Sequence, residues 1–494
     1  MSEPSTFLAF DLGAESGRAV LGRFQNGYLE TEEVHRFANE PVHYNGGLHW
    51  DAPRLWLEIR RSLEQVSRSG LRRLSGIGVD TWGLDFALLG EGGALLDNPY
   101  HYRDARADGM VDEVCSIVPA DEIYSETGIQ FMQINSLYHL YAAAKRSPRL
   151  LASAEKLLTI PDLLNYWLTG RAVCEYTNAT TTQFLSARSR QWACGLLQRL
   201  GIPTHFLAEV VEPASEIGPL LQSLSNECGL SPAPVFAPAC HDTGSAVAAI
   251  AMGPRSAYIS SGTWSLLGTE VPHPVITPMA RKMNFTNEGG VGGTIRLLKN
   301  ITGMWLLHGC KKAWEAAGLQ FDYADLVEHA TQARPLQSLV DPDHRNFLRP
   351  ANMLQAIDEF CRRTQQPKPD GPGAYARCVL DSLALKYRYV LDALESVTGA
   401  SYDEVRVVGG GARNRLLNQL TADATNRRTV AGPAEATALG NLAVQLLAAG
   451  CVGSLAEARG VIDRSLPTQT FEPANAVPYE EAYLRFRQYC EQVF

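Results

Sequence analysis

FLAFDLGAESGRAVLG, residues 7–22, joins one apolar strand-like run to another through a short turn of glycine and other small residues. Two later stretches follow a similar plan: AYISSGTWSLLG at 257–268 and VRVVGGGARNRLL at 405–417. A glycine turn at the end of a strand lets backbone N–H groups converge on an anion, because no Cβ blocks the approach. Three such turns predict a split binding site for a polyphosphate, which is typical of a phosphoryl-transfer enzyme.

The composition is that of an ordinary globular protein, with 45% apolar and 20% charged residues. A chain of 494 residues exceeds what one hydrophobic core normally holds, so we expect two or three domains. The net charge of −9 argues against nucleic acid and anionic membrane as partners. It still allows a small-molecule substrate and a local basic pocket for phosphate.

Neither a membrane span nor a secretory signal is indicated, since no run of about 18 apolar residues occurs and Asp11 interrupts the first apolar run. We therefore expect a cytoplasmic protein. The 10 cysteines include no C-x-x-C pair, which argues against a zinc site and a disulfide framework. Cys361 and Cys378 are expected to be two buried thiols, with a pair as the alternative. The oligomeric state is left open.

Strand-like and helical patterns mix along the first half. A hairpin is predicted at 7–24 and an extended stretch at 79–89, whereas helical spacing occurs at 54–67, 134–144 and 161–168. This mixture favours an α/β fold.

The passage LSPAPVFAPAC, residues 230–240, is rich in Pro and Ala and is predicted to cross into a second half. We therefore expect two domains, 1–240 and 241–494, with the last helix able to pack back on the first domain. The second half opens with a strand-turn-strand much like that of the first half, which suggests a duplicated architecture. A long amphipathic helix is predicted around 376–394, and a surface helix at 479–493.

The first turn carries groups suited to phosphate. Asp11 closes an apolar strand, where an unpaired carboxylate is costly unless it meets a cation or donors. The turn that follows exposes backbone N–H groups, and Ser16 and Arg18 add side-chain donors. The alternative is a plain hairpin in which Asp11 is only a turn former.

The other two glycine turns are less specific. Ser260 to Ser265 places hydroxyl groups around Gly262, and its alternative is a polar β-turn. Gly409-Gly410-Gly411 leads into a helix at 416–425 and could begin a dinucleotide fold. However, Asn414 stands at the sixth position of G-x-G-x-x-G, where that motif has a glycine. A Walker A sequence is absent.

His241-Asp242-Thr243 lies between an apolar run at 235–240 and a helical run at 244–251. One interpretation makes Asp242 or Thr243 a helix N-cap, which stabilises a helix by about 1 kcal/mol. The other makes Asp242 a general base that accepts a hydroxyl proton, as kinases need.

Further polar clusters interleave with glycine and aromatic residues, a mixture that suits a sugar because sugars need directional partners and a stacking face. The clusters are DTWGLD (80–85), YRDAR (102–106), TNATTT (177–182) and TNEGG (286–290). Each cluster alone is more typical of a loop or cap, and only their number favours a sugar site.

The motifs DLGAESGR (11–18), ISSGTWS (259–265), VGGGARN (408–414) and PAEATALGNLAVQLL (433–447) resemble those of the FGGY carbohydrate kinases over essentially the whole chain. Within that family, GVDTWGLDF (78–86), EYTNATTTQ (175–183) and LKNITGMWLL (298–307) look most like enzymes acting on the deoxy-ketose L-rhamnulose. The resemblance implies phosphorylation at O1, with L-fuculose as the alternative sugar and a non-catalytic sugar sensor as the alternative class.

The resemblance also implies two ribonuclease-H-like domains of the actin-like ATPase type with a cleft between them. It implies ATP and Mg²⁺ as cofactors, with Asp11 holding the magnesium ion, largely through water. The residues matched to nucleotide contacts are Ala14, Glu15, Ser16, Gly17, Arg18, Thr263, His308 and Gly410. The residues matched to the sugar site are Gly83, His241, Asp242, Thr243 and Asn300, with Asp242 as proton acceptor. At His308 the family carries glutamine, so an imidazole replaces an amide there.

Overall fold

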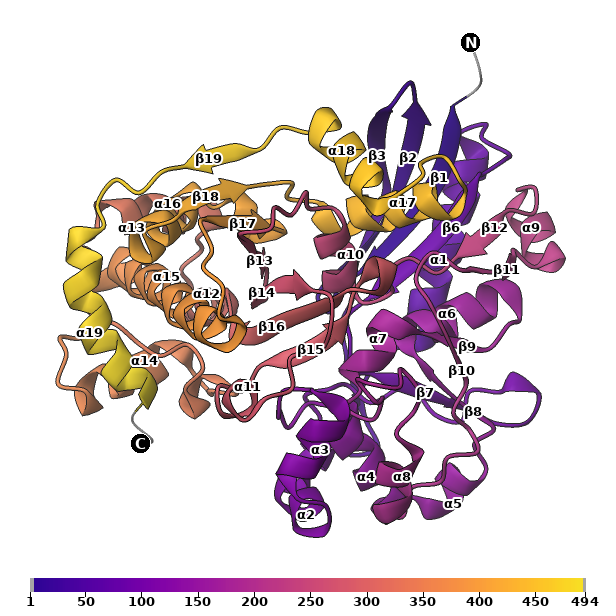
Figure 1. Cartoon of the computed structure of the whole chain (residues 1–494), viewed down its shortest axis with the longest axis horizontal. Coiled ribbons are helices and arrows are strands. Elements are labelled where there is room, and N and C mark those ends of the chain that lie inside the picture. Colours follow the sequence, from indigo (N-terminus) through magenta and orange to yellow (C-terminus); the bar gives the residue numbers. More distant parts are fainter. Residues whose placement is uncertain (1–3, 492–494) are drawn as a thin grey trace. The chain divides into compact units, whose positions relative to one another are not determined.

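The structure, a computed structural model, describes residues 4–491 and divides into two compact units (Figure 1). The first unit comprises the described residues up to Ala251 together with Glu270–Leu297 and Ala436–Leu466. The second comprises Met252–Thr269, Leu298–Glu435 and the described residues from Pro467 onward. The chain therefore passes between the units several times. We had expected a single crossing after residue 240.

A six-stranded sheet forms the centre of the first unit, in the order β11-β12-β6-β1-β2-β3. Strands β1, β2 and β3 form an antiparallel meander, β6 and β12 run parallel to β1, and β11 is antiparallel to β12. The strands are β1 (Ser5–Leu12), β2 (Ser16–Gln25), β3 (Tyr28–Ala38), β6 (Gly76–Thr81), β11 (Glu216–Pro219) and β12 (Pro234–Phe236). The hairpin predicted at 7–24 is therefore confirmed.

The second sheet has seven strands, in the order β19-β18-β17-β13-β14-β16-β15, and its first six strands repeat the order of the first sheet; β15 is Thr286–Gly289. Here β13 pairs antiparallel with β14 and parallel with β17, β17 is parallel to β18, and β18 is antiparallel to β19. The strands are β13 (Ser256–Ser261), β14 (Trp264–Val271), β16 (Ile295–Thr302), β17 (Glu404–Val408), β18 (Arg428–Ala431) and β19 (Gln469–Phe471). The duplicated α/β architecture that the two hairpins suggested is thus present in the strand order.

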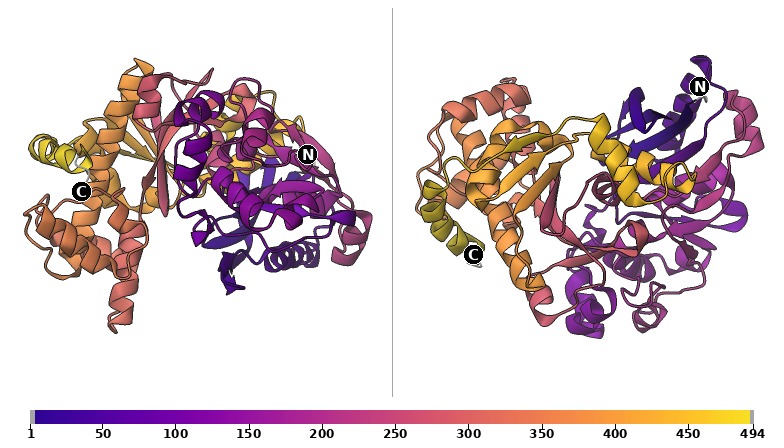
Figure 2. Two further views of the ribbon diagram at one scale, coloured as in Figure 1. Left: turned by 90° about the horizontal axis from the view of Figure 1, so that it is seen from below. Right: turned by 45° about the horizontal axis from the view of Figure 1, so that its top comes forward.

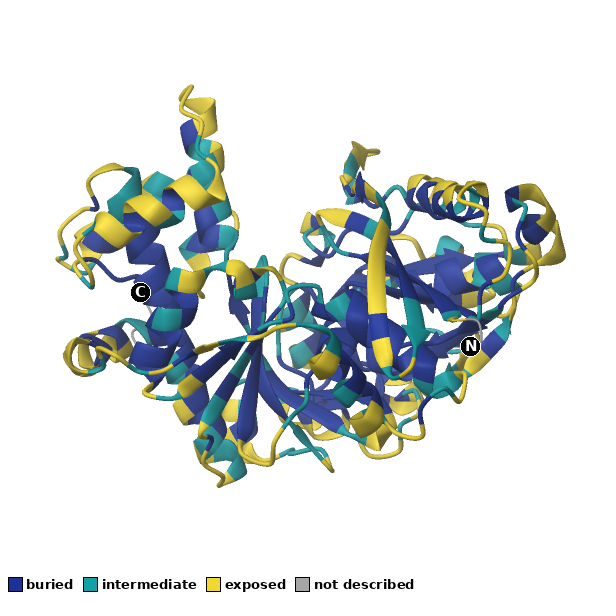
Figure 3. Cartoon of the chain, turned by 90° about the horizontal axis from the view of Figure 1, so that it is seen from above, coloured by how far each residue is buried: buried dark blue, intermediate teal, exposed yellow. Residues whose placement is uncertain are grey.

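Helices cover these sheets, and the strands between them are largely buried (Figure 3). In the first unit the main helices are α1 (Ala52–Arg68), α4 (Ser136–Arg146), α6 (Ile160–Thr169), α10 (Asp242–Ala248), α17 (Ala436–Ala448) and α18 (Leu455–Ser465). In the second they are α12 (Trp305–Ala316), α13 (Tyr323–Gln332), α14 (Met353–Arg363), α15 (Gly371–Thr398), α16 (Arg415–Thr425) and α19 (Val477–Glu491). Cys361 and Cys378, on α14 and α15, are both buried and free.

The segment that returns to the first unit is α17 and α18, not the last helix. Helix α17 packs on β1, β6 and α10, and α18 packs on β3; Figure 2 shows this yellow segment beside the indigo strands. The closing helix α19 packs instead on α15 and α16 of the second unit.

A smaller region of the first unit lies between β6 and β11. Its core is built around the buried side chains of α4 and the strands β7 and β8. The elements are β7 (Phe86–Leu89), α2 (Met110–Ile117), α3 (Ala120–Thr127), α5 (Pro148–Ala152), β8 (Lys156–Thr159), β9 (Val173–Glu175), α7 (Tyr176–Thr181), α8 (Cys194–Arg199) and β10 (Glu209–Val211). Among residues 4–491, no helix is both long and apolar enough to cross a lipid bilayer.

Candidate active site

The first turn pairs the two charged residues that the sequence singled out. Asp11 on β1 lies opposite Arg18 on β2, and the Nε and Nη2 of Arg18 donate to Asp11 Oδ2 at 2.9 and 2.5 Å. The backbone N–H of Gly13 donates to the carbonyl of Ser16 at 2.9 Å and closes the turn. Asp11 is tolerated at the end of a buried strand because a cation meets one of its oxygens.

A second carboxylate lies beside Asp11. Asp80 is the residue aligned with Asp11 on the parallel strand β6, and it is fully buried. The side-chain amide of Asn441 on α17 donates to Asp80 Oδ2 at 2.6 Å, whereas Oδ1 has no partner. Burial raises the pKa of Asp80 well above its ordinary value, and the nearby Asp11 and Asp242 add to the rise.

Asp242 is the first residue of α10, and the helix cap is His241, whose side chain makes no capping hydrogen bond. The N-cap interpretation of Asp242 and Thr243 is therefore wrong. Asp242 Oδ1 accepts from the backbone N–H of Thr243 at 2.5 Å and from its hydroxyl at 3.2 Å. The side chain is 30% exposed, so Oδ2 is the oxygen left to accept a proton from a ligand.

The surroundings of Asp242 favour a proton acceptor. Burial raises the pKa of its carboxyl, the neighbouring His241 opposes the rise, and the Asp11 carboxylate adds to it. A carboxylate with a raised pKa is a stronger base, so this arrangement suits proton abstraction better than an ordinary surface aspartate would.

The polar cluster at 177–182 holds the Gly83 and His241 segments together. The side-chain amide of Asn178 donates to the carbonyls of Trp82 and Cys240, each at 3.3 Å. The His241 N–H donates to the hydroxyl of Thr177 at 3.2 Å. Both segments are thereby fixed from one short helix, α7, in which every residue is buried.

Gly83 packs tightly against the cluster at 177–182. A Cβ at this position would come within 3.0 Å of the Thr181 side chain, and the next residue, Leu84, donates its N–H to the Thr181 hydroxyl at 3.0 Å. The first unit therefore gathers Asp11, Arg18, Gly83 and the residues His241 to Thr243.

The predicted residues 14–17 belong to the same unit, at the turn from β1 into β2. Thr263, Asn300, His308 and Gly410 belong to the second unit, where the two other glycine turns meet. A Cβ at Gly409 would lie 2.9 Å from the carbonyl oxygen of Ser261, and one at Gly411 would lie 2.0 Å from its hydroxyl. A Cβ at Gly410, in contrast, meets no heavy atom within 4 Å. Gly409 and Gly411 are thus required by packing, whereas Gly410 faces open space.

Helix α12 starts on the turn that contains Thr263. The N–H of Met304 donates to the carbonyl of Gly262 at 3.1 Å, and that of Trp305 donates to Thr263 at 3.2 Å. His308 follows one turn later on α12, with its ring 5.2 Å from that of Tyr323. Asn300 lies on β16 and is half-buried.

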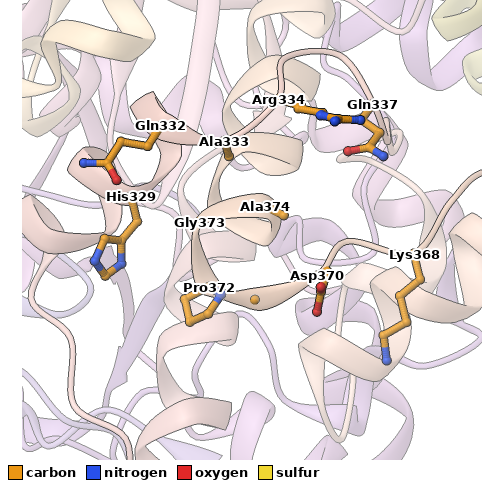
Figure 4. Close-up of a pocket in the computed structure, with 11 residues that line it drawn as sticks. His329, Gln332, Ala333, Arg334, Gln337, Lys368, Asp370, Pro372, Gly373 and Ala374 are labelled. Carbon is orange, nitrogen blue, oxygen red and sulfur yellow. The ribbon is translucent and has the colours of Figure 1, made fainter.

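Figure 4 shows a cavity elsewhere in the second unit, about 440 Å³ in volume. It lies between the end of α13 and the first turn of α15, and His329, Arg334 and Lys368 are among its lining residues. None of the residues singled out from the sequence lines it, so it is separate from the groups described above.

Comparison with known proteins agrees with this organisation. Residues 6–249 match the N-terminal domain of the FGGY family of carbohydrate kinases, and residues 257–449 match its C-terminal domain. A rhamnulokinase from Bacteroides thetaiotaomicron is 44% identical over 482 residues, covering 97% of this chain and 98% of that protein. One from Oceanobacillus iheyensis is 41% identical, covering 94% and 97%.

Solved structures match over nearly the whole chain as well. A gluconate kinase from Lactobacillus acidophilus gives a TM-score of 0.81 at 17% identity, covering 99% of this chain and 97% of that one. A Plasmodium falciparum glycerol kinase with ADP gives 0.75 at 15% identity, covering 99% and 98%. At these identities the likeness shows the fold alone.

Proposed function

The chain belongs to the FGGY family of carbohydrate kinases, and from this membership we propose that it transfers the γ-phosphoryl group of ATP to O1 of L-rhamnulose. The product is L-rhamnulose 1-phosphate, as an enzyme of rhamnose catabolism would make it. The relatives named above, which match it almost end to end at 41–44% identity, are rhamnulokinases. Their similarity is what supports this particular sugar.

We assign proton transfer to Asp242. The observation that supports this role is that Thr243 holds one carboxylate oxygen, while the side chain remains 30% exposed. As O1 of the sugar forms its bond to the γ-phosphorus, the bond from that phosphorus to the β,γ-bridging oxygen breaks and ADP leaves. The O1 proton passes to Asp242 Oδ2, because Oδ1 is held by the N–H and hydroxyl of Thr243. Solvent then accepts the proton.

The residues present fit a magnesium ion beside the first turn. Asp80 Oδ1 is a buried carboxylate oxygen without a partner, and it lies next to Asp11 on the paired strands. Carboxylate oxygens are the ligands Mg²⁺ prefers, and the ion dehydrates reluctantly, so Asp11 would hold it largely through water. When bound, it offsets negative charge on the phosphates.

We assign the nucleotide to two groups of residues. Arg18 and the backbone of residues 14–17 supply donors in the first unit, while Thr263, His308 and Gly410 supply the second unit's part. Gly410 is compatible with this assignment, since a Cβ there would meet no atom of another residue within 4 Å, whereas its neighbours Gly409 and Gly411 are closely packed. Gly83, His241, Thr243 and Asn300 are assigned to the sugar.

The proposal is tested by a panel of ketoses and deoxy-ketoses in a coupled assay of ADP release. We expect the highest kcat/KM with L-rhamnulose and a primary phosphate ester at O1 by ³¹P NMR of the product. A higher kcat/KM with L-fuculose would show that L-fuculose, and not L-rhamnulose, is the preferred substrate of this kinase. Binding of sugar without any sugar-dependent ADP release would show a sensing protein instead and overturn the proposal.

A further inference from the structure

The imidazole of His241 is surrounded on both of its nitrogens. Its Nε2 lies 3.4 Å from Asp242 Oδ1. Its Nδ1 lies 3.1 Å from Nη2 of Arg296 and 3.2 Å from Oε2 of Glu288. Arg296 is fully buried on β16, and Glu288 is buried on β15 (Thr286–Gly289). All four residues belong to the first unit, which includes residues 295–297 at the start of β16.

The two groups at Nδ1 demand opposite protonation of the ring. A guanidinium has only donors, so Arg296 needs Nδ1 as an acceptor. Glu288 is taken as a carboxylate: burial raises its pKa, but its pKa is nevertheless lowered, and the positive charge of the Arg296 guanidinium is the largest of the opposing causes. An ionised carboxylate only accepts, so Glu288 would need a hydrogen on Nδ1.

The geometry decides between them. An N–H of Arg296 is aligned with Nδ1 as a hydrogen bond, while Glu288 Oε2, although close, makes no aligned hydrogen bond. Arg296 is itself fixed, since its Nε donates to the carbonyl of Gly289 at 2.8 Å. Nδ1 is therefore an acceptor, and in a neutral ring the hydrogen must be on Nε2, the nitrogen that faces Asp242.

We propose that Arg296 is a positioning residue that holds His241 in the Nε2–H tautomer and so prepares Asp242 for proton transfer. A hydrogen on Nε2 presents the positive edge of the ring to Asp242 Oδ1, 3.4 Å away, which favours negative charge on this carboxylate, while Oδ1 is held by Thr243 and Oδ2 is left for the sugar hydroxyl. The ring is also prevented from taking the sugar proton itself, because its one lone pair faces Arg296. The positioning role of Arg296 rests on the proposed function of Asp242 as the base. The inferred tautomer of His241 does not depend on that function.

The tautomer can be observed directly in the unmodified protein. Long-range ¹H–¹⁵N NMR of the histidine side chains distinguishes a protonated from an unprotonated Nδ1, and a His241→Gln spectrum identifies the signal. We expect Nδ1 of His241 to be unprotonated at neutral pH. A protonated Nδ1 would overturn the proposal, whatever the enzyme's activity proves to be.

The variant Arg296→Met tests the link to catalysis. With the guanidinium gone, Glu288 draws a hydrogen onto Nδ1, so the ¹⁵N signal should move to the protonated range. We expect kcat with L-rhamnulose to fall about tenfold or more, by analogy with other residues that orient a catalytic group, while KM for ATP changes little. Arg296→Lys keeps a cationic donor and should recover part of the loss.

Arg459→Met is the matched control. Arg459 is also a largely buried, ion-paired arginine of the first unit: it contacts Glu270 at 2.7 Å and donates to the carbonyl of Val247 on α10. It makes no contact with His241, so its loss should leave the Nδ1 signal unchanged. If both variants lower kcat equally and neither moves that signal, Arg296 is only structural and the proposal fails. If Arg296→Met does not fold, the wild-type spectrum still tests the tautomer of His241, and Arg296→Lys still tests the link between position 296 and kcat.

Discussion

Asp242 differs from an ordinary aspartate at a helix start in how its two oxygens are used. One oxygen accepts two donors from Thr243, while the side chain keeps 30% of its surface exposed. A capping aspartate would direct its oxygens to the backbone N–H groups of the next turn. The separation of one held and one free oxygen is what a base needs in order to present a lone pair in a defined direction.

Gly410→Val should weaken ATP binding and leave sugar binding unchanged. A side chain there enters space that no protein atom occupies, so the fold tolerates it but a nucleotide in that space does not. Calorimetric titration with ATP and with sugar measures both affinities.

Gly195→Val is the control for Gly410→Val, because a Cβ at Gly195 on α8 also meets nothing within 4 Å. It should leave ATP affinity at the wild-type value. Equal ATP affinity in Gly410→Val and Gly195→Val would remove Gly410 from the nucleotide site.

The candidate site residues that could be singled out from the sequence lie in local patterns. Asp11 and Asp242 each end an apolar run, and Gly410 lies in a run of three glycines. Arg296 and Asn441 were missed, since they reach His241 and Asp80 from 55 and 361 residues away along the chain. No short-range pattern marks such a partner, and only the folded backbone brings it near.

Among the elements, α10 and α17 depend on one glycine. A Cβ at Gly440 on α17 would lie 1.7 Å from the carbonyl oxygen of Ser245 on α10. The two helices therefore approach each other backbone to backbone, and α17 in turn packs on β1 and β6. This contact supports the helix that begins with Asp242.

Gly440→Ala should destabilise the protein and lower kcat. Adding a methyl group to such a tight contact forces the two helices apart, which typically costs about 1–3 kcal/mol. Thermal unfolding should show a lower Tm than that of Gly453→Ala, the control, where the nearest atom to a Cβ is a flexible Glu457 oxygen at 3.5 Å. The same Tm in both variants would refute the close-packing explanation.

Hairpins and amphipathic helices could be predicted from periodicity, since a turn or an apolar face is local. The sheet against which α17 and α18 pack could not be predicted in this way. The run ATALGNLAVQLL is apolar on most sides, which indicates burial but not the sheet on which the helix packs. We also expected the last helix to be able to return to the first unit, whereas α19 buries Tyr479, Ala482, Tyr483 and Phe486 and packs on α15 and α16.

At the scale of the whole molecule, several carboxyls are buried without a cation. Burial raises the pKa of Asp85 to about 7, of Asp162 to about 8 and of Glu175 to about 7, from ordinary values of 3.8, 3.8 and 4.5. Between about pH 4 and 8 these three carboxyls therefore bind more protons in the folded state than in the unfolded chain. Their contribution to the free energy of unfolding falls as pH rises through this window.

Asp162→Asn should reduce that pH dependence. The backbone N–H of Glu175 donates to Asp162 Oδ1 at 3.0 Å, and an asparagine oxygen can accept the same bond without a charge. We expect the Tm of the variant to fall less between pH 5 and pH 8 than that of the wild type. An unchanged difference between the two pH values would contradict the assignment of a raised pKa to Asp162.

The turnover of Asp242→Asn with L-rhamnulose and ATP tests most directly whether Asp242 accepts the proton of O1. Removing a general base typically lowers the rate by about 10²–10⁴-fold, and asparagine keeps the size and the Thr243 contacts of the side chain. We expect a loss of kcat in that range, with the affinities for sugar and ATP, measured by calorimetry, retained. A folded variant that binds both ligands and loses less than tenfold in kcat would contradict it.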